Sequence, residues 1–395
     1  MAEATDPTSG SELAPEPAGL APEPEGFASG SELAPEPEGL APAPDRPAVH
    51  GADSALDPVA ALERIAYLLE QAREPTYRVR AFRSAAATAG KAGPERLTEL
   101  AATGRLRDLR GIGDTTANVI AEALAGQQPH YLVRLEAEHK PEAARVIDPA
   151  VAELRAALRG DCHTHSDWSD GGSPIDVMAR AARDLGHAYV VLTDHSPRLT
   201  IAHGLSPERL RQQLELVAEL NEEMAPFRIL TGIEVDILED GGLDQDEDLL
   251  ASLDVVVASV HSKLRMDSEA MTLRMIRAME HPNTDILGHC TGRIVVGRGR
   301  PESTFDADAV FATCARHGKA VEINSRPERL DPPKRLLRKA LDHGCVVSID
   351  TDAHAPGQLE WQINGCERAV ACDVPVERVV NTWDADRLLA WASSH

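Results

Sequence analysis

The stretch DCHTHSDWSDGG, residues 161–172, places His163 and His165 two positions apart and a carboxylate, Asp170, five positions further on. Six more short apolar runs end in polar or ionisable residues: AYVVLTDH, FRILTGIEVDI, DVVVASVHS, TDILGHC, KAVEINS and CVVSIDTDAH. Collected from these runs, the candidate metal ligands are His163, His165, Asp170, His195, Glu234, His261, His289, Asp352 and His354. Imidazole nitrogens and carboxylate oxygens are ligands for zinc, manganese and iron(II). The residue types therefore predict a metal centre.

The spacing of these residues indicates more than one ion. Residues at i and i+2 of a strand point the same way, so we expect His163 with His165, and Asp352 with His354, to act as pairs. A single histidine after a strand is more often an ordinary hydrogen-bonded side chain. Burying this many ionisable groups without compensation would, however, cost several kcal/mol for each group, which metal binding removes. The set predicts two or three divalent ions that share Glu234.

The elements that must position these ligands are seven short β-branched runs, each followed by a stretch with helical periodicity. Repeated strand-then-helix units predict a parallel α/β barrel of the TIM kind, here a seven-stranded (βα)7 barrel over residues 160–395. Sites in such barrels are built where the strands end, which is where every candidate ligand lies.

Residues 1–55 have a different composition, in which SGSELAPEP recurs and glutamates alternate with prolines. Such a segment cannot bury an apolar face, so we expect a disordered tail. No apolar run approaches the ~20 residues of a membrane helix, and the start of the chain lacks a signal-peptide pattern. The six cysteines are scattered without a CxxC pair, which is typical of reduced core thiols. We therefore expect a cytoplasmic protein without a membrane partner.

Residues 56–137 read as short amphipathic helices, beginning with DPVAALERIAYLLEQA. Within them, LRDLRGIGDTTANVIAEAL has the form of a helix, a turn at Gly111 and Gly113, and a second helix. The free amides at the start of a helix suit a nucleic-acid phosphate, although the same pattern also makes a plain helical connection.

Arginines support the nucleic-acid interpretation of this helical segment. Arg78, Arg80 and Arg83 form a cluster in YRVRAFRSAA, which could also be an ordinary solvated helix face. The chain as a whole carries a net charge of −24, so DNA binding has to depend on local clusters of this kind and not on overall charge.

The segment LERIAYLLE…PTYRVRAFRSAA…LTELAATGRLRDLRGIGDTTANVIAEAL resembles the N-terminal helix-hairpin-helix domain of bacterial family X DNA polymerases. The resemblance implies binding of DNA ends or gaps through backbone phosphates. Val119 stands where lyase-active members carry a Schiff-base lysine, so we expect no deoxyribose-phosphate lyase activity of that kind. Residues 138–159 read as a linker with one helix, and a polymerase palm with paired aspartates is absent, so the chain is not a polymerase.

The motifs HxH with a following SDG, then TDH, GxE, SVHS, GH and TDAH resemble those of the PHP family, named for polymerase and histidinol phosphatase. The likeness extends from about residue 160 to 391 and is greatest to the PHP module of bacterial family X polymerases. Carried over by position, it implies one ion on His163, His165, Glu234 and Asp352, a second on Glu234, His261 and His289, and a third on Asp170, His195 and His354. At the position of Asp170, a ligand of the third ion, some relatives carry a histidine.

A clustered metal site of this kind predicts phosphoester hydrolysis, with His163, His165, Glu234, His261, His289, Asp352 and His354 as the catalytic set. Arg293 and Arg329 are candidates for holding a phosphate, or else surface ion pairs, and Asp194 and Asn324 are candidates for orienting ligands.

Three functions remain open on the sequence. The first, which the resemblance favours, is a DNA phosphoesterase for repair: a 3′–5′ exonuclease, a 3′-end processing enzyme or an abasic-site nuclease. The second is a phosphatase of a small monoester such as histidinol phosphate. The third is a DNA-binding adaptor with a structural barrel, against which the intact ligand set speaks.

Overall fold

The computed structural model describes residues 57–143 and 146–394. The tail predicted for residues 1–55 lies outside the described residues. Among the described helices, none has the length and apolar character required to cross a lipid bilayer.

The helical segment folds into a compact set of helices. Its elements are α1 (Pro58–Gln71), α2 (Thr76–Ala92), α3 (Pro94–Ala102), η1 (Leu106–Asp108), α4 (Asp114–Leu124) and α5 (His130–Ala143). Asp57 begins α1 by accepting a hydrogen bond from Ala60 N at 3.0 Å, with Pro58 in the first turn, as expected for an Asp-Pro start. Leu62, Ile65 and Leu69 of α1 are fully buried in the core of this domain.

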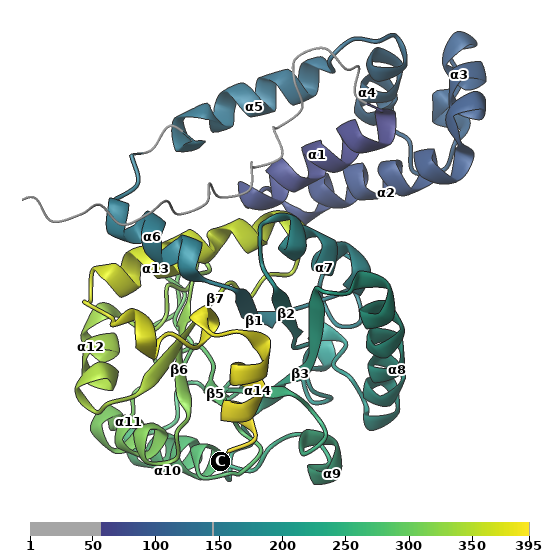
Figure 1. Ribbon diagram of the computed structural model, residues 1–395. Helices are drawn as coiled ribbons and strands as arrows, with labels where there is room; N and C mark the ends of the chain where they lie inside the picture. The colour runs from purple at the N-terminus through teal and green to yellow at the C-terminus, as the bar shows by residue number, and fades with distance from the viewer. Residues whose placement is uncertain (1–56, 144–145, 395) are drawn as a thin grey trace, which may run out of the picture. The chain divides into compact units, whose positions relative to one another are not determined.

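Seven strands form one all-parallel sheet in sequence order, which rolls into a barrel with helices outside it (Figure 1). The strands are β1 (Gly160–Thr164), β2 (Tyr189–Leu192), β3 (Arg228–Asp236), β4 (Val255–Ser259), β5 (Ile286–Leu287), β6 (Ala320–Asn324) and β7 (Val346–Asp350). Thr164 and Ala353 form a parallel bridge, and His165 N donates to Ala353 O at 2.8 Å, so the first and last strands meet and nearly close the ring. The predicted (βα)7 barrel is confirmed.

The elements around the barrel follow the strands in turn. They are α6 (Pro149–Ala157), α7 (Ile175–Asp184), η2 (Thr200–Ala202), α8 (Pro207–Met224), α9 (Glu247–Leu250), α10 (Ser268–Met279), α11 (Ala307–Arg316), α12 (Lys334–Asp342), η3 (Pro356–Trp361), α13 (Gln362–Val370), η4 (Val376–Arg378), η5 (Val380–Thr382) and α14 (Ala385–Ala392). Helix α6, inside the range predicted as a linker, buries Val151 and Leu154 against α13 and the strands β6 and β7, so it is part of the barrel core.

Strand β3 illustrates how alternation separates core from site. Ile233 and Val235 face outward and pack in a cluster with the outer helices, whereas Leu230 joins the apolar cluster with Val255 and Val257. Glu234 lies four positions after Leu230, which is two repeats of the pleat, and therefore points in the same inward direction nearer the carboxyl end of the strand. The apolar interior thus ends where the ionisable side chains begin.

Candidate metal centre

All nine predicted ligands meet at the carboxyl ends of the strands. His163 lies in β1 and Glu234 in β3, and the remaining seven lie in the loops that follow β1, β2, β4, β5 and β7. In contrast, β6 and the loop after it provide none of the nine.

Glu234 is at the centre of the cluster and is 1% exposed. Its Oε2 lies 2.9 Å from His195 Nδ1 and 3.3 Å from His163 Nε2. Its Oε1 lies 2.9 Å from His289 Nε2 and 3.2 Å from His261 Nε2. Oε2 also lies 3.6 Å from His165 Nε2, so the two carboxylate oxygens face five imidazoles between them, as a bridging ligand would.

A second set of contacts extends from this centre toward the outside. Asp170 Oδ1 lies 3.2 Å from His354 Nε2 and 3.5 Å from His195 Nε2. His165 Nε2 lies 3.5 Å from Asp352 Oδ1, between this outer pair and Glu234. His165 is fully buried and Asp170 is exposed, so the cluster runs from the barrel interior to its mouth.

Three groups of side chains bring ligand atoms within 4.8 Å of one another. They are His165 with Asp170, His195 and His354; His163 with His165 and Glu234; and His195 with Glu234 and His261. The third of these includes His195 in place of the His289 that the resemblance assigns, although His289 also contacts Glu234. The assignment of each residue to one ion stays a prediction.

The donor set fits divalent cations, because many of its buried atoms lack a hydrogen bond within the described part of the chain. These atoms are His163 Nε2, His165 Nδ1 and Nε2, His195 Nδ1, His261 Nε2, His289 Nδ1 and Nε2, and both carboxylate oxygens of Glu234. Orphaned buried polar atoms are rare because each is costly. Burial, with Arg329 as the next cause, lowers the pKa of His289 to about 3, so its imidazole is the neutral form that binds a metal.

Asp352 and His354 reach the cluster by a turn and not by strand alternation. Strand β7 ends at Asp350, and Asp352 has a φ of 53°, in the left-handed region that non-glycine residues rarely adopt. The i, i+2 argument therefore applies to His163 and His165 at β1 but not to this pair. A non-glycine residue in this conformation at a ligand position is typical of functional sites.

Carboxylates behind the ligands were missed by the sequence reasoning. Glu322 in β6 is fully buried, with Oε1 2.8 Å from His163 Nδ1, and it accepts the backbone N–H of His289. Asp236 contacts His261 Nδ1 in the same manner. Burial raises the pKa of Glu322 to about 7 despite the opposing effect of His163. The signal available was the alternation that puts Asp236 two positions after Glu234 on one strand face.

We expect Glu322→Gln to weaken metal binding by about 10-fold to 100-fold, the usual effect of removing a carboxylate that orients a ligating histidine. The measurement is equilibrium dialysis of manganese, together with the manganese concentration that gives half-maximal hydrolysis. Glu219→Gln, on the exposed face of α8, is the matched control. Equal manganese affinity in both variants would contradict the role given to Glu322.

The two residues predicted to orient ligands have different surroundings. Asn324 Nδ2 donates to Glu322 Oε1 at 3.2 Å and to Asp352 Oδ2 at 3.3 Å, so it touches a ligand directly. Asp194 instead accepts from Ser166 N at 2.9 Å and from Gln213 Nε2 at 2.6 Å. Asp194 therefore stabilises the loop after β1, which carries Asp170, and does not orient the imidazole of a histidine.

Guanidinium groups from the loop after β6 lie beside Asp352. Arg329 Nε is 3.1 Å from Asp352 Oδ2, and its buried Nη1 has no hydrogen-bond partner among the described residues. Arg326 Nη1 donates to Asp352 O at 3.0 Å and lies 3.1 Å from His354 Nδ1, a contact the sequence did not indicate. Arg293 donates to Arg329 O at 3.0 Å, so it supports this loop from behind. Phosphate contacts by Arg293 and Arg329 stay predictions.

In the predicted arginine cluster of the helical domain, two of the three arginines are already paired with residues of the same domain. Arg83 donates through Nε and Nη2 to Glu70 at 2.8 Å each, and Arg78 bonds Glu74 and Tyr131. Arg80 is exposed and has no ion-pair partner among the described residues. The prediction of phosphate contact therefore falls mainly on Arg80.

The predicted turn has the geometry of a close helix approach. Gly111 has a φ of 89°, in the left-handed region that favours glycine, and a Cβ there would lie 2.8 Å from Ser84 Oγ, so the two helices approach closely at this turn. Gly113 precedes α4 and donates to Thr116 Oγ1 at 2.9 Å. A hollow of about 610 Å³ adjoins this turn, and Lys91 and Arg110 are its cationic lining residues. The first amides of α4 have no acceptor inside the helix.

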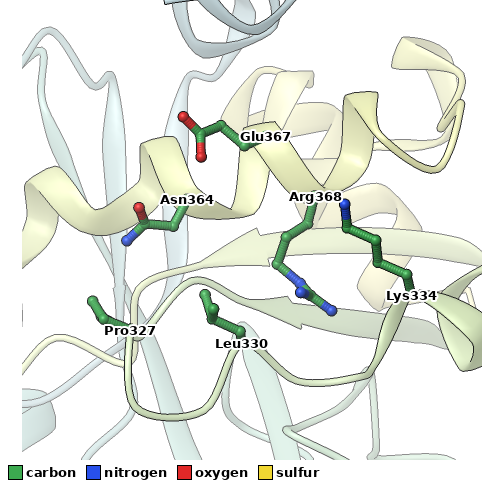
Figure 2. Close-up of a pocket in the computed structure, with 6 residues that line it drawn as sticks. All are labelled: Pro327, Leu330, Lys334, Asn364, Glu367 and Arg368. Atoms are coloured by element: carbon green, nitrogen blue, oxygen red, sulfur yellow. The ribbon is translucent and has the colours of Figure 1, made fainter. Parts of the chain in front are cut away.

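Another hollow, of about 260 Å³, lies between the loop after β6 and helix α13 (Figure 2). Its lining residues are Pro327, Leu330, Lys334, Asn364, Glu367 and Arg368. Arg368 points from α13 toward the loop and donates to Pro332 O. None of the nine ligands lines this hollow, so it is separate from the metal centre.

Comparison with protein families gives two matches. Residues 161–326 match the PHP domain, and residues 56–129 match a helix-hairpin-helix domain. The first match covers the barrel from β1 to β6, and the second covers residues 56–129 of the predicted helical segment.

Individual relatives with more than 30% sequence identity align with about half of the chain. It is 42% identical over 212 residues to the DNA polymerase/3′-5′ exonuclease PolX of Bacillus subtilis, covering 54% of this chain and 37% of that protein. It is 31% identical over 205 residues to a probable phosphatase of Thermoanaerobacter sp., covering 49% of this chain and 78% of the relative. The chain thus spans little more than a third of the PolX protein.

Among solved structures, the histidinol phosphate phosphatase of Lactococcus lactis, complexed with zinc, L-histidinol and phosphate, aligns at 18% identity and a TM-score of 0.39. The alignment covers 60% of this chain and 95% of that one. From the family match, the curated relatives and the intact ligand set, the chain belongs to the PHP family and is a metal-dependent phosphoesterase, with a helix-hairpin-helix domain ahead of its barrel.

Proposed function

We propose that this phosphoesterase hydrolyses DNA, removing nucleotides or blocking groups at 3′ ends or cleaving at abasic sites during repair. The observation that carries the proposal is the helix-hairpin-helix domain on the same chain as the PHP barrel, with a cation-lined hollow at its Gly111 turn. The PolX relative supports it, since that protein's name includes a 3′-5′ exonuclease. The helical domain would hold backbone phosphates while the barrel acts on the strand.

The ligands named above would hold two or three ions, manganese or zinc in our proposal. Divalent ions bound there supply Lewis-acid chemistry, which stabilises charge on phosphoryl oxygens and makes water a nucleophile at neutral pH. Glu234 faces five imidazoles with its two carboxylate oxygens, and Glu322 and Asp236 would fix the tautomers of His163 and His261 from behind.

The substrate phosphate would be held by the guanidinium groups beside Asp352. Arg329 offers the unpartnered Nη1, and Arg326 offers its planar fork next to His354. Asp352 lies between these cations and His165, which keeps both guanidinium groups at the edge of the ligand cluster. A bound phosphate would therefore meet arginines on one side and ligands on the other.

A second candidate is hydrolysis of a small phosphate monoester such as histidinol phosphate. The observation that favours it is the 31% identity to a probable phosphatase of which this chain covers 78%. In either case we place the protein in the cytoplasm, because its six cysteines are all buried and unpaired, as expected in a reducing compartment.

The experiment that tests the DNA proposal uses the double variant Arg80→Glu with Arg110→Glu. Both residues are exposed and have no ion-pair partner among the described residues. Wild-type protein with manganese, and separately with zinc, should shorten a 5′-labelled 3′-recessed DNA in a ladder. In the variant, the slope of log affinity against log salt should fall by about two and cleavage should drop, because about two phosphate contacts are lost.

Two comparisons make the result decisive. Arg316→Glu, an exposed arginine of α11 in the barrel, should leave DNA cleavage unchanged. Hydrolysis of p-nitrophenyl phosphate should be equal in all three proteins. Absence of DNA shortening by the wild type under both metals, with small-ester turnover intact, would replace the DNA proposal by the small-monoester one.

A further inference from the structure

The end of helix α1 packs directly against η3, the short helix that follows the last two metal ligands. Gly357 N donates to Glu70 Oε2 at 3.1 Å, and Trp361 Nε1 donates to Gln71 O at 3.1 Å. A Cβ at Gly357 would lie 2.3 Å from Tyr67 O, so only glycine allows this approach. The helical domain therefore contacts the barrel at η3, beside the metal centre.

Two carboxylates take part in this contact. Glu360 of η3 accepts from Tyr67 Oη and, at 3.1 Å, from Gln71 Nε2, whereas Glu70 comes from α1 and is only 3% exposed. A buried carboxylate is tolerated when it is paired and hydrogen-bonded. Arg83 supplies the pairing through two bonds of 2.8 Å, and Gly357 N supplies a further bond from the first turn of η3. Glu70 thus caps η3 as an acidic residue caps a helix N-terminus, although it comes from another domain.

The cap is connected to the metal ligands through a short run of backbone. η3 begins at Pro356, two positions after His354, and His354 N donates to Gln358 Oε1 at 2.7 Å inside η3. Asp352, with its left-handed φ, lies two positions before His354. A conformation of this kind persists only when its surroundings hold it. Displacement of η3 would therefore move His354 away from Asp170.

We propose that Glu70, held by Arg83, is a positioning residue of the phosphoesterase site. In this role the helical domain fixes the loop that carries Asp352 and His354, in addition to any role in binding DNA. The inference does not depend on DNA being the substrate. It implies that a substrate too small to reach the helical domain still requires that domain for normal metal binding and turnover.

The test compares Glu70→Ala with Glu63→Ala, an exposed residue on the same helix. In metal-free full-length protein, hydrogen exchange of residues 352–362 should be accelerated by Glu70→Ala and unchanged by Glu63→Ala. The manganese concentration for half-maximal hydrolysis of bis(p-nitrophenyl) phosphate should rise about 10-fold, as for loss of a residue behind a ligand. The rate at saturating manganese should change less than that concentration does.

Two more variants separate positioning from folding. Glu70→Gln keeps an oxygen that can accept from Gly357 N, so it should recover part of the metal affinity. Gly357→Ala forces the same contact open from the barrel side. It should accelerate hydrogen exchange and raise the manganese requirement as predicted for Glu70→Ala, and it provides the test if the Glu70→Ala protein does not fold. Unchanged exchange and manganese requirement in a folded Glu70→Ala or Gly357→Ala protein would overturn the proposal. If the wild type cleaves the small ester but not DNA, the DNA proposal fails and the role of Glu70 is unaffected. If the wild type cleaves neither substrate, hydrogen exchange of residues 352–362 in the metal-free protein still tests the role of Glu70.

Discussion

Glu234→Gln should reduce hydrolysis of both DNA and p-nitrophenyl phosphate by at least ~1000-fold, equivalent to about 4 kcal/mol of transition-state stabilisation. The two carboxylate oxygens of Glu234 face five imidazoles between them, so no other residue contacts as many of the ligands. An amide keeps the shape of the side chain but offers a single acceptor oxygen and no negative charge. The variant should therefore lose the charge shared between metal sites and retain the fold.

The measurement is the initial rate at saturating manganese, with Glu219→Gln as the control. Glu219 is exposed on α8, and its substitution should leave both rates within experimental error of the wild type. Circular dichroism should be the same for the wild type and both variants. A Glu234→Gln protein that keeps a tenth or more of the wild-type activity would contradict the central position assigned to this carboxylate.

The second large effect concerns stability. Chelation of metal from the purified protein should lower its melting temperature, because the orphaned imidazoles and the carboxylate of Glu234 then lie buried without a partner. At a metal concentration about 100 times the dissociation constant, binding stabilises the native state by about 2.7 kcal/mol. For a domain of this size, that corresponds to a shift of roughly 5–10 °C. Differential scanning calorimetry with and without manganese measures it.

The same experiment separates an enzyme from a structural metal protein. In Glu234→Gln the manganese-dependent shift should shrink to a small fraction of its wild-type value, while Glu219→Gln should keep it. A large shift in a protein that hydrolyses neither DNA nor small esters would favour the adaptor with a structural barrel. Equal melting temperatures with chelator and with manganese would show that the cluster does not hold manganese.

Much of the fold could be predicted because its signals are local. All seven apolar runs became strands, although β5 has only two residues, Ile286–Leu287, in place of the longer run TDILGHC. Each run was recognisable by its β-branched residues and by the ionisable residue at its end. The parallel order followed from the intervening helices, since a parallel pair of strands requires such a crossover.

The meeting of the nine candidate ligands could also be predicted, because a histidine or carboxylate at the end of a strand has few structural reasons to be there. The role of Glu322 could not, because its partner His163 is 159 positions away in the sequence and no local spacing connects the two. The same limitation applies to Arg83, which the sequence presents as a free cation. Its carboxylate partner Glu70 comes from another helix, and no local spacing indicates such a pair.

Because β6 and the loop after it contribute none of the nine candidate ligands, charged side chains are distributed unevenly around the mouth of the barrel. Six strands or their loops supply imidazoles and carboxylates, whereas the loop after β6 supplies Arg326 and Arg329. An anion entering from the β6 side meets guanidinium groups first, while entry across Asp170 brings it past a carboxylate. The ring of strands is nearly symmetric, but the charges around its mouth are not, and we expect this asymmetry to orient a substrate phosphate before any bond is broken.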